Sequence, residues 1–233
     1  MDDYRPSLRL ATYNIHRCIG NDNRFDPDRI ITVISQLNAD IIALQEVETG
    51  HDGNTDFLNS LREHFRMEII PGLTMYRDDS SYGNVLLTRH RIEKMEHINI
   101  SFQGREPRGA VCLRMQINNK NLRVIATHLG LMRSERSIQT RLLLNALNRR
   151  RSDISVVMGD LNEWFFMGKP LRLLRKYFAN TGSPATFPAR FPLLSLDRIL
   201  VRPGSCLRSI EPLKTPLTRS ASDHLPLIAT IVF

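Results

Sequence analysis

The chain has 233 residues, of which 42% are apolar and 24% are charged, and its formal net charge is +8. This length suits one large globular domain, and we expect a single domain over residues 1–233. The positive charge, carried mostly by arginine, predicts a polyanionic partner, either nucleic acid or anionic phospholipid. A basic surface that binds nothing is the alternative.

The three cysteines are far apart and include no Cys-x-x-Cys pair. A zinc site or a disulfide framework is therefore not expected. No stretch approaches the ~18 apolar residues of a transmembrane helix, and the first residues lack a secretory signal. We expect a cytoplasmic protein, a monomer rather than an oligomer, with peripheral contact to an anionic membrane surface as one option.

Short runs of consecutive apolar residues alternate along the chain with segments whose apolar residues recur at helical spacing. This pattern predicts a mixture of strands and helices. Strands are predicted over residues 8–15, 41–44, 67–70, 84–88, 124–127, 154–158, 196–201, 207–213 and 226–233, with an antiparallel meander between 91 and 124. Helices are predicted from Pro27 after an Asp26 cap, over residues 57–65, after a Ser134 cap, and over residues 170–178. Residues 180–193 show no periodicity and predict a long loop.

Polar residues recur where the predicted apolar strands end. The clearest case is a turn carrying Asp160 and Asn162 directly after the buried run 156–158. Such positions are partly buried, so polar groups there cost free energy unless they have partners. Strands lying side by side would bring these ends to one pocket. The full set is Asn14, Glu46, His128, Asp160, Asn162, Asp197, Asp223 and His224.

This set is rich in oxygen donors, which suit Mg²⁺ or Mn²⁺ better than zinc. Mg²⁺ usually binds one or two carboxylates together with substrate phosphate, which Glu46 with Asp160 or Asp223 can supply. His224 is a candidate general acid or base, and Asp197 is a candidate to orient it. The set predicts metal-assisted attack of water on phosphorus, with the other histidine and the amides holding phosphate oxygens.

Six short motifs follow one another in order. They are Thr12-Tyr13-Asn14, Leu44-Gln45-Glu46, Thr127-His128-Leu129, Gly159-Asp160-Leu161-Asn162, Leu196-Asp197-Arg198-Ile199-Leu200 and Ser222-Asp223-His224-Leu225-Pro226. The series resembles that of the endonuclease/exonuclease/phosphatase (DNase I-like) superfamily, in particular its small stand-alone bacterial members. This resemblance implies a four-layered α/β sandwich of two packed mixed β-sheets flanked by helices, with the site at one edge. It also implies a Mg²⁺-dependent phosphoesterase.

The resemblance further implies roles for the strand-end residues. Glu46 matches the principal metal ligand, with Asn14 beside it in the metal shell. Asp223 matches a further ligand on the metal or phosphate side. Asp160 matches the residue that positions or activates the attacking water, and Asn162 matches its partner near the phosphate.

The two histidines are matched in the same way. His224 matches a residue that serves as general base in some branches and as phosphate contact in others, and Asp197 matches its paired carboxylate. His128 matches the DNase I, sphingomyelinase and phosphatase branches. Apurinic endonucleases generally lack a histidine there, so abasic-site repair is not expected.

Three further residues are candidate substrate contacts. Asn84 follows Tyr82-Gly83, as in a common family motif, and either faces the phosphate or caps a turn. Arg108 either clamps a phosphate or lies in a solvated turn, and His16 is a candidate for the pocket because it lies two residues beyond a strand-end asparagine. Residues 164–166, Trp-Phe-Phe, are expected to pack against the core or the rim rather than to contact a base or a lipid tail.

These residues together predict a phosphodiesterase that acts on nucleic acid or on a phospholipid headgroup. A phosphomonoesterase of the inositol-phosphatase type is one alternative, because residues 197–200 weakly resemble that branch. The other alternative is a non-catalytic module that binds nucleic acid or anionic membranes. Against it, every expected metal and base position is filled.

Overall fold

Two mixed β-sheets form the centre of the computed structural model, which describes residues 6–50, 57–76, 80–149, 152–179 and 182–233. Within these ranges, one sheet contains β1 (Ser7–Asn14), β2 (Ile41–Thr49), β3 (Glu68–Tyr76), β4 (Ser81–Thr88), β10 (Leu207–Pro212) and β11 (Leu227–Val232). The other contains β5 (Lys94–Asn99), β6 (Gly109–Ile117), β7 (Lys120–His128), β8 (Ile154–Asp160) and β9 (Asp197–Arg202).

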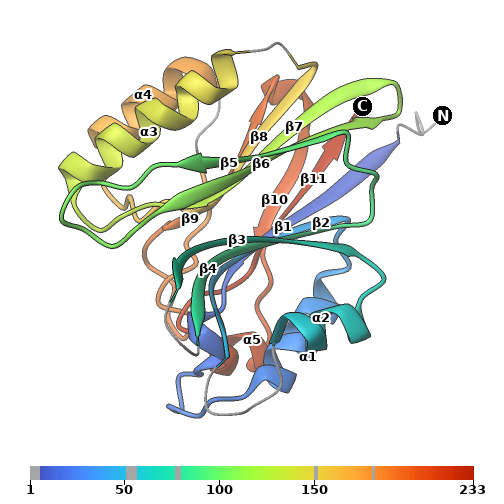
Figure 1. Cartoon of the computed structure of the whole chain (residues 1–233), viewed down its shortest axis with the longest axis vertical. Helices are drawn as coiled ribbons and strands as arrows, with labels where there is room; N and C mark the ends of the chain where they lie inside the picture. The colour runs from blue at the N-terminus through green and yellow to red at the C-terminus, as the bar shows by residue number, and fades with distance from the viewer. Residues whose placement is uncertain (1–5, 51–56, 77–79, 150–151, 180–181) are drawn as a thin grey trace.

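The order of strands in each sheet places the predicted site residues near the middle. The first sheet runs β10-β11-β1-β2-β4-β3 and the second runs β5-β6-β7-β8-β9 (Figure 1). Strands β1 and β2 are parallel, and so are β7 and β8. Because parallel neighbours end at the same edge, each pair delivers its last residues side by side.

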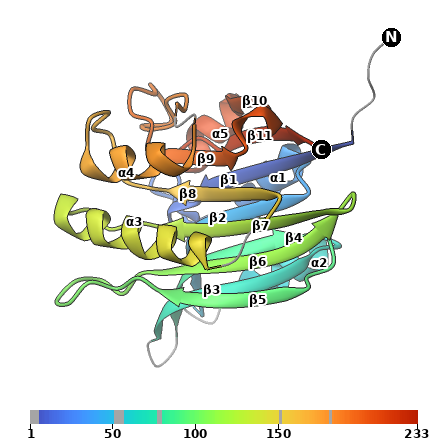
Figure 2. The same ribbon diagram turned by 90° about the horizontal axis from the view of Figure 1, so that it is seen from above.

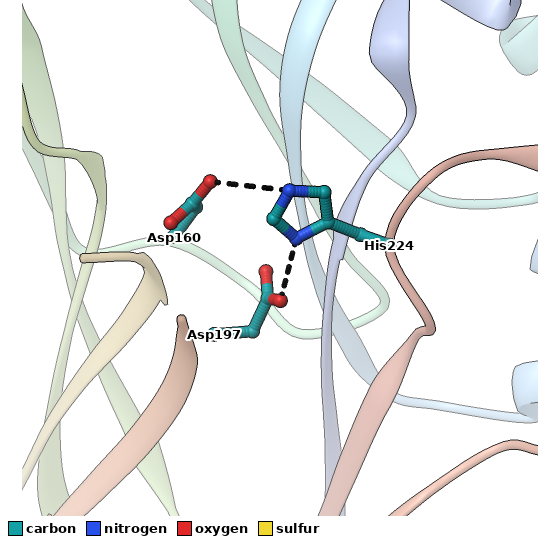
Figure 3. A group of neighbouring side chains, drawn as sticks. All are labelled: Asp160, Asp197 and His224. Atoms are coloured by element: carbon teal, nitrogen blue, oxygen red, sulfur yellow. Dashed lines mark hydrogen bonds and ion pairs between the residues drawn. The ribbon is translucent and has the colours of Figure 1, made fainter. Parts of the chain in front are cut away.

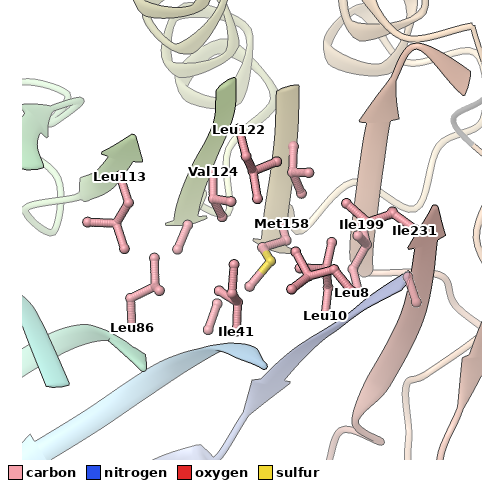
Figure 4. Close-up of a cluster of buried hydrophobic side chains, with 14 of the residues drawn as sticks. Leu8, Leu10, Ile41, Leu86, Leu113, Leu122, Val124, Met158, Ile199 and Ile231 are labelled. Carbon is pink, nitrogen blue, oxygen red and sulfur yellow. The ribbon is translucent and has the colours of Figure 1, made fainter. Parts of the chain in front are cut away.

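The main hydrophobic core lies between the two sheets. Alternate residues of each strand point into it, since side chains in a strand alternate between the two faces (Figure 4). Its members from the first sheet include Leu8, Leu10, Ile41, Leu86 and Ile231, and those from the second include Leu113, Leu122, Val124, Met158 and Ile199.

Helices cover the outer faces of both sheets. Helices α1 (Pro27–Leu37), α2 (Phe57–His64) and α5 (Pro216–Ala221) lie on the six-stranded sheet, whereas α3 (Arg133–Asn148) and α4 (Lys169–Tyr177) lie on the other (Figure 2). Two 3₁₀ turns, His16–Cys18 and Gly204–Cys206, complete the set in the described residues. The result is the predicted four-layered sandwich. Among the described helices, none has the length and apolar character needed to span a membrane.

Helix starts show which local predictions hold. Asp26 caps α1 as predicted, because its Oδ1 accepts a hydrogen bond from the backbone N–H of Arg29 at 2.9 Å. The predicted Ser134 cap of α3 is wrong. Met132 is the N-cap residue, and its backbone N–H donates instead to Glu135 Oε2 at 3.4 Å. Glu135, in the first turn of α3, thus accepts from the backbone N–H of the N-cap residue, and the serine hydroxyl does not cap the helix.

Three other elements differ from the prediction. Strands β2 and β3 continue to Thr49 and Tyr76, well beyond residues 44 and 70, because both stay paired with β4 across register shifts. Helix α5 was not predicted, since six residues give no periodic signal. The predicted loop of residues 180–193 begins outside the described residues, and its described part is closed by a bridge between Phe187 and Leu194.

Candidate active site

Strand β8 delivers the central carboxylate of the site. Gly159 has φ of 144°, and a Cβ there would overlap the carbonyl of Thr127 on β7, so a glycine is needed for this close approach. Asp160 is the last residue of β8, so the prediction that it lies on the following turn is wrong. Asn162 lies beyond the strand with φ of 50°, and its backbone N–H donates to Asp160 Oδ1 at 2.8 Å.

The carboxylate of Asp160 is the point where the predicted residues meet. Its Oδ2 lies 3.1 Å from Asn14 Nδ2, 3.5 Å from His128 Nε2 and 3.7 Å from His224 Nε2. These partners come from β1, from the end of β7 and from the segment before β11, so both sheets contribute. Burial raises the pKa of Asp160 to about 6, with the charge of Asp197 acting in the same direction.

His224 is held by a buried carboxylate (Figure 3). Its Nδ1 donates to Asp197 Oδ2 at 2.8 Å, and Thr186 Oγ1 donates to the same oxygen at 2.6 Å. Burial alone would lower the pKa of His224, but the carboxylates, Asp197 first and then Asp160, outweigh it and raise that pKa to about 10. The ring is therefore charged at neutral pH, and both of its nitrogens face carboxylates.

His128 has the opposite electrostatic environment. Its Nδ1 lies 2.8 Å from Arg108 Nη1, and an arginine can only donate, so Nδ1 is unprotonated. Burial, followed by the charges of Arg108 and His224, lowers the pKa of His128 well below its ordinary value. The neutral ring carries its proton on Nε2. The Nε2 proton faces Asp160 Oδ2 at 3.5 Å, whereas the neighbouring Asn162 amide nitrogen, 3.0 Å from Nε2, donates to the carbonyl of Leu129 at 2.9 Å.

Glu46 reaches the site through a β-bulge. The pairing of β2 with β4 shifts by one residue between Leu44 and Val47. As a consequence both side chains pack into the core between this sheet and its helices, although they are three residues apart. Glu46 lies inside this bulge with φ of 56°. Its Oε1 accepts a hydrogen bond from Asn14 Nδ2 at 3.0 Å. The bulge thus joins the carboxylate of β2 to the amide of β1.

The donor set fits a divalent cation. Asp160, Asp197 and His224 form the one cluster of three possible ligands in the described part of the chain, with ligand atoms all within 4.8 Å of one another. The protonated His224 ring has no free lone pair, so the carboxylate oxygens are the atoms that can face a cation. Asp197 Oδ1 is buried without a hydrogen-bond partner. In addition, the single Asn14 amide serves two carboxylates, those of Glu46 and Asp160. An excess of buried carboxylate oxygens over donors is what a hard cation such as Mg²⁺ would satisfy.

The remaining predicted residues lie around this centre. Asp223 Oδ1 lies 3.3 Å from Ser222 Oγ and 3.9 Å from His16 Nδ1. The backbone N–H of His16 donates to Asn14 Oδ1 at 3.0 Å, so this segment orients the asparagine amide.

Two candidate substrate contacts have protein partners instead. Asn84 Nδ2 donates to the carbonyl of Gly109 at 3.2 Å, which ties β4 to β6. Arg108 is buried against His128 and forms an ion pair of 3.2 Å with Glu106, so it does not lie in a solvated turn. Residues 164–166, expected to pack against the core or the rim, do not lie in the core, because these three side chains are 50–67% exposed.

Sequence reasoning missed two hydroxyl groups that support the site. Ser222 Oγ donates to the carbonyl of Asn14 at 2.8 Å and lies 3.2 Å from the backbone N–H of His224, which donates to it. Ser222 stands in one of the six motifs, so its position was visible as a signal. Thr186, which donates to Asp197, lies in a loop without periodicity, and nothing in the sequence distinguishes it.

The fold and the site together define an α/β sandwich of the phosphoesterase type, in which buried aspartates and histidines meet at the strand ends. Residues 11–224 match the endonuclease/exonuclease/phosphatase family, and the chain belongs to that family. It is 32% identical over 247 residues to the uncharacterized protein YbhP of Escherichia coli K12, with 97% of this chain and 96% of that protein covered.

Solved structures show the same fold at lower identity. The endonuclease/exonuclease/phosphatase from Beutenbergia cavernae matches with a TM-score of 0.79 and 22% identity, covering 98% of this chain and 72% of that one. The catalytic domain of human Nocturnin matches with a TM-score of 0.76 and 19% identity, covering 99% and 95% respectively.

Proposed function

We propose that the protein is a Mg²⁺-dependent phosphodiesterase that hydrolyses a phosphodiester bond by direct attack of water on phosphorus. The observation that supports this most is the single oxygen of Asp160 that faces Asn14, His128 and His224 within 3.7 Å. With its pKa raised to about 6, Asp160 is deprotonated at neutral pH and still basic enough to accept a proton.

The two histidines bind the phosphate in this proposal. Both Nε2 atoms lie close to the same oxygen of Asp160, so a phosphate placed beside that oxygen is within reach of both. His224 contributes a charged N–H and His128 a neutral one. Because His224 is already protonated, we assign it to stabilising charge on the phosphate oxygens and not to removing a proton from water.

The reaction then follows from these positions. A water beside Asp160 Oδ2 attacks phosphorus, with Asn162 orienting it, and its proton passes to Asp160. The new P–O bond forms as the bond to the leaving oxygen breaks, and the leaving oxygen takes a proton from solvent. Glu46 and Asn14 would hold Mg²⁺, with Asp223 as a further ligand. The cation supplies positive charge that stabilises the developing negative charge on the phosphate.

The test is hydrolysis of bis-p-nitrophenyl phosphate with Mg²⁺ and with a chelator. We expect chelator-sensitive turnover that Glu46→Gln and His224→Ala each reduce by about 100-fold or more. Circular dichroism at pH 7 should show that both variants are folded, although His224→Ala should have a lower melting temperature because Asp197 loses its partner. Glu48→Gln, on the same strand, and His64→Ala, on α2, are the matched controls and should retain activity. A folded Glu46→Gln variant with wild-type turnover would refute the assignment.

Two further substrates separate the alternatives. Turnover of p-nitrophenyl phosphate but not of the diester would make the protein a phosphomonoesterase. Cleavage of single-stranded DNA would make it a nuclease. Failure on all of these substrates would favour the non-catalytic module.

A further inference from the structure

Large apolar side chains are exposed on two loops that begin at the site. The loop after β7 exposes Leu131 and Met132, and the loop after β8 exposes residues 164–167, Trp-Phe-Phe-Met. We call these six residues the apolar rim; their exposed fractions run from 48% to 67%. Soluble monomers rarely expose so many large apolar side chains together without a partner. Helices α3 and α4, which the two loops precede, lie side by side (Figure 2).

A buried ion pair fixes the two loops against each other. Arg136 lies 3.4 Å from Glu163, and both side chains are fully buried. The Arg136 guanidinium also donates to the carbonyl of Leu131 and lies 5.1 Å from the centre of the Trp164 ring. Burying a charged pair costs free energy unless both charges have partners, and here both do. These contacts hold the two loops in one arrangement, so the exposed apolar rim above them is an ordered surface.

Cations lie directly behind the rim. Helix α4 carries Lys169, Arg172, Arg175 and Lys176 and contains no acidic residue. The Arg175 guanidinium lies 3.9 Å from the centre of the Phe166 ring. Apolar side chains at the tip with basic residues behind them are the arrangement by which proteins bind the interface of an anionic bilayer.

The chemistry of the rim favours lipid over nucleic acid. Single-stranded nucleic acids bind by stacking bases on open aromatic faces. Here guanidinium groups lie over the rings of Trp164, Phe165 and Phe166. The other half of the rim, Leu131, Met132 and Met167, offers no ring at all, whereas flexible aliphatic side chains suit the acyl region of a bilayer.

A second exposed apolar pair lies on another loop, one that contacts the site. Phe191 and Leu193 are 77% and 79% exposed, on the loop closed by Phe187 and Leu194. The Phe187 ring lies 4.9 Å from the ring of His224. Exposed apolar groups thus occur on a third loop that also contacts the catalytic centre, and a membrane that accepts all of them would place the site near the headgroups.

We propose that the apolar rim is a membrane-docking surface that inserts into anionic phospholipid bilayers. This inference goes beyond the proposed function and does not depend on it, because docking requires no hydrolysis. Vesicles of phosphatidylglycerol and phosphatidylcholine are the probe. Trp164 is the only tryptophan of the chain, so its fluorescence reports on the rim alone. We expect a blue shift of its emission with these vesicles, quenching by brominated acyl chains, and no shift with phosphatidylcholine alone.

Matched variants test the two parts of the surface. Phe166→Ser/Met167→Ser should weaken vesicle binding by about tenfold or more, whereas Met95→Ser, an exposed methionine on β5, should not. Lys169→Gln/Arg172→Gln should weaken binding to the anionic vesicles, whereas Arg208→Gln/Lys214→Gln, exposed cations on and after β10, should have a smaller effect.

Three results would overturn the docking surface. They are wild-type affinity in the Phe166→Ser/Met167→Ser variant, binding to phosphatidylcholine alone as tight as to the anionic vesicles, and quenching of Trp164 by a single-stranded oligonucleotide with no response to vesicles. The last result would assign the rim to nucleic acid. Hydrolysis of the soluble diester is measured in the same variants and should not change. If wild type does not hydrolyse that diester but still docks, only the proposed function fails.

Discussion

Arg108 Nη1 lies 2.8 Å from Nδ1 of His128, and this contact determines which nitrogen of the ring is unprotonated. Arginine has no acceptor and stays charged, so Nδ1 must accept. The imidazole therefore presents an N–H from Nε2 toward Asp160 and, in the proposed mechanism, toward the phosphate. The sequence left Arg108 either as a phosphate clamp or as a solvated turn residue; the structure places it against His128, where we expect it to position that ring.

Replacing Arg108 should change the titration of His128. Burial is the main cause of the lowered pKa of His128, and the charge of Arg108 adds to it; in Arg108→Gln that charge is lost, so the pKa should rise toward its ordinary value. Turnover of the soluble diester should fall by about tenfold, because the ring can then adopt the other tautomer. Two-dimensional ¹H–¹⁵N NMR of the imidazole measures both the pKa and the tautomer. Arg105→Gln, an exposed arginine three residues away, is the control; equal spectra for the two variants would contradict the assigned role.

The pairing of His224 with Asp197 should make stability depend on pH. The folded pKa of His224, about 10, lies above its ordinary value of 6.5, so the protonated ring stabilises the fold. This contribution is complete below about pH 6.5 and is lost as the pH rises through about 10. We expect the free energy of unfolding of wild type to fall by about 2–4 kcal/mol over that window.

Asp197→Asn should flatten this dependence, because the first carboxylate that raises the pKa of His224 is gone. Urea unfolding between pH 6.5 and 10 measures it, and NMR titration of the ring should show a pKa moved back toward 6.5. The same slope in wild type and variant would show that other groups cause the dependence.

Neutralising Asp160 should stabilise the protein while removing activity. Its folded pKa of about 6 exceeds the ordinary value of 3.8, so the charged carboxylate lowers the free energy of unfolding above about pH 6. Protonation of Asp160 at lower pH removes this destabilisation. Asp160→Asn should therefore gain about 1–3 kcal/mol at pH 7.5, measured by urea unfolding. The surface variant Asp153→Asn should gain nothing, because backbone hydrogen bonding to Asn121 lowers the pKa of Asp153. A less stable Asp160→Asn would contradict the argument.

Local sequence patterns predict the buried strands and their polar ends well. The apolar run before Asp160 and the cap at Asp26 depend on neighbours in the chain, and the structure has both. The ordered motifs extend this to the site, where seven of the eight strand-end residues join one hydrogen-bonded or ion-paired group. Its members are Asn14, Glu46, His128, Asp160, Asn162, Asp197 and His224.

Features that depend on distant partners could not be predicted in this way. Arg108 contacts His128, which lies twenty residues away at the end of β7. Thr186 contacts Asp197 because of the path that its loop takes. The exposure of Trp164 is a similar case. An aromatic run usually packs inward, but the buried pair of Arg136 and Glu163 occupies the space beneath it.

The bulge in β2 has a consequence for how this chain can vary. Because the position of Glu46 is set by one extra residue between Leu44 and Val47, it depends on the number of residues there as much as on their identity. Deleting Gln45 would restore regular alternation and move Glu46 into the fully buried position of Gln45, whose side chain faces Thr12, although every other residue of the strand stayed the same. In this segment a change of length is therefore more damaging than most changes of side chain.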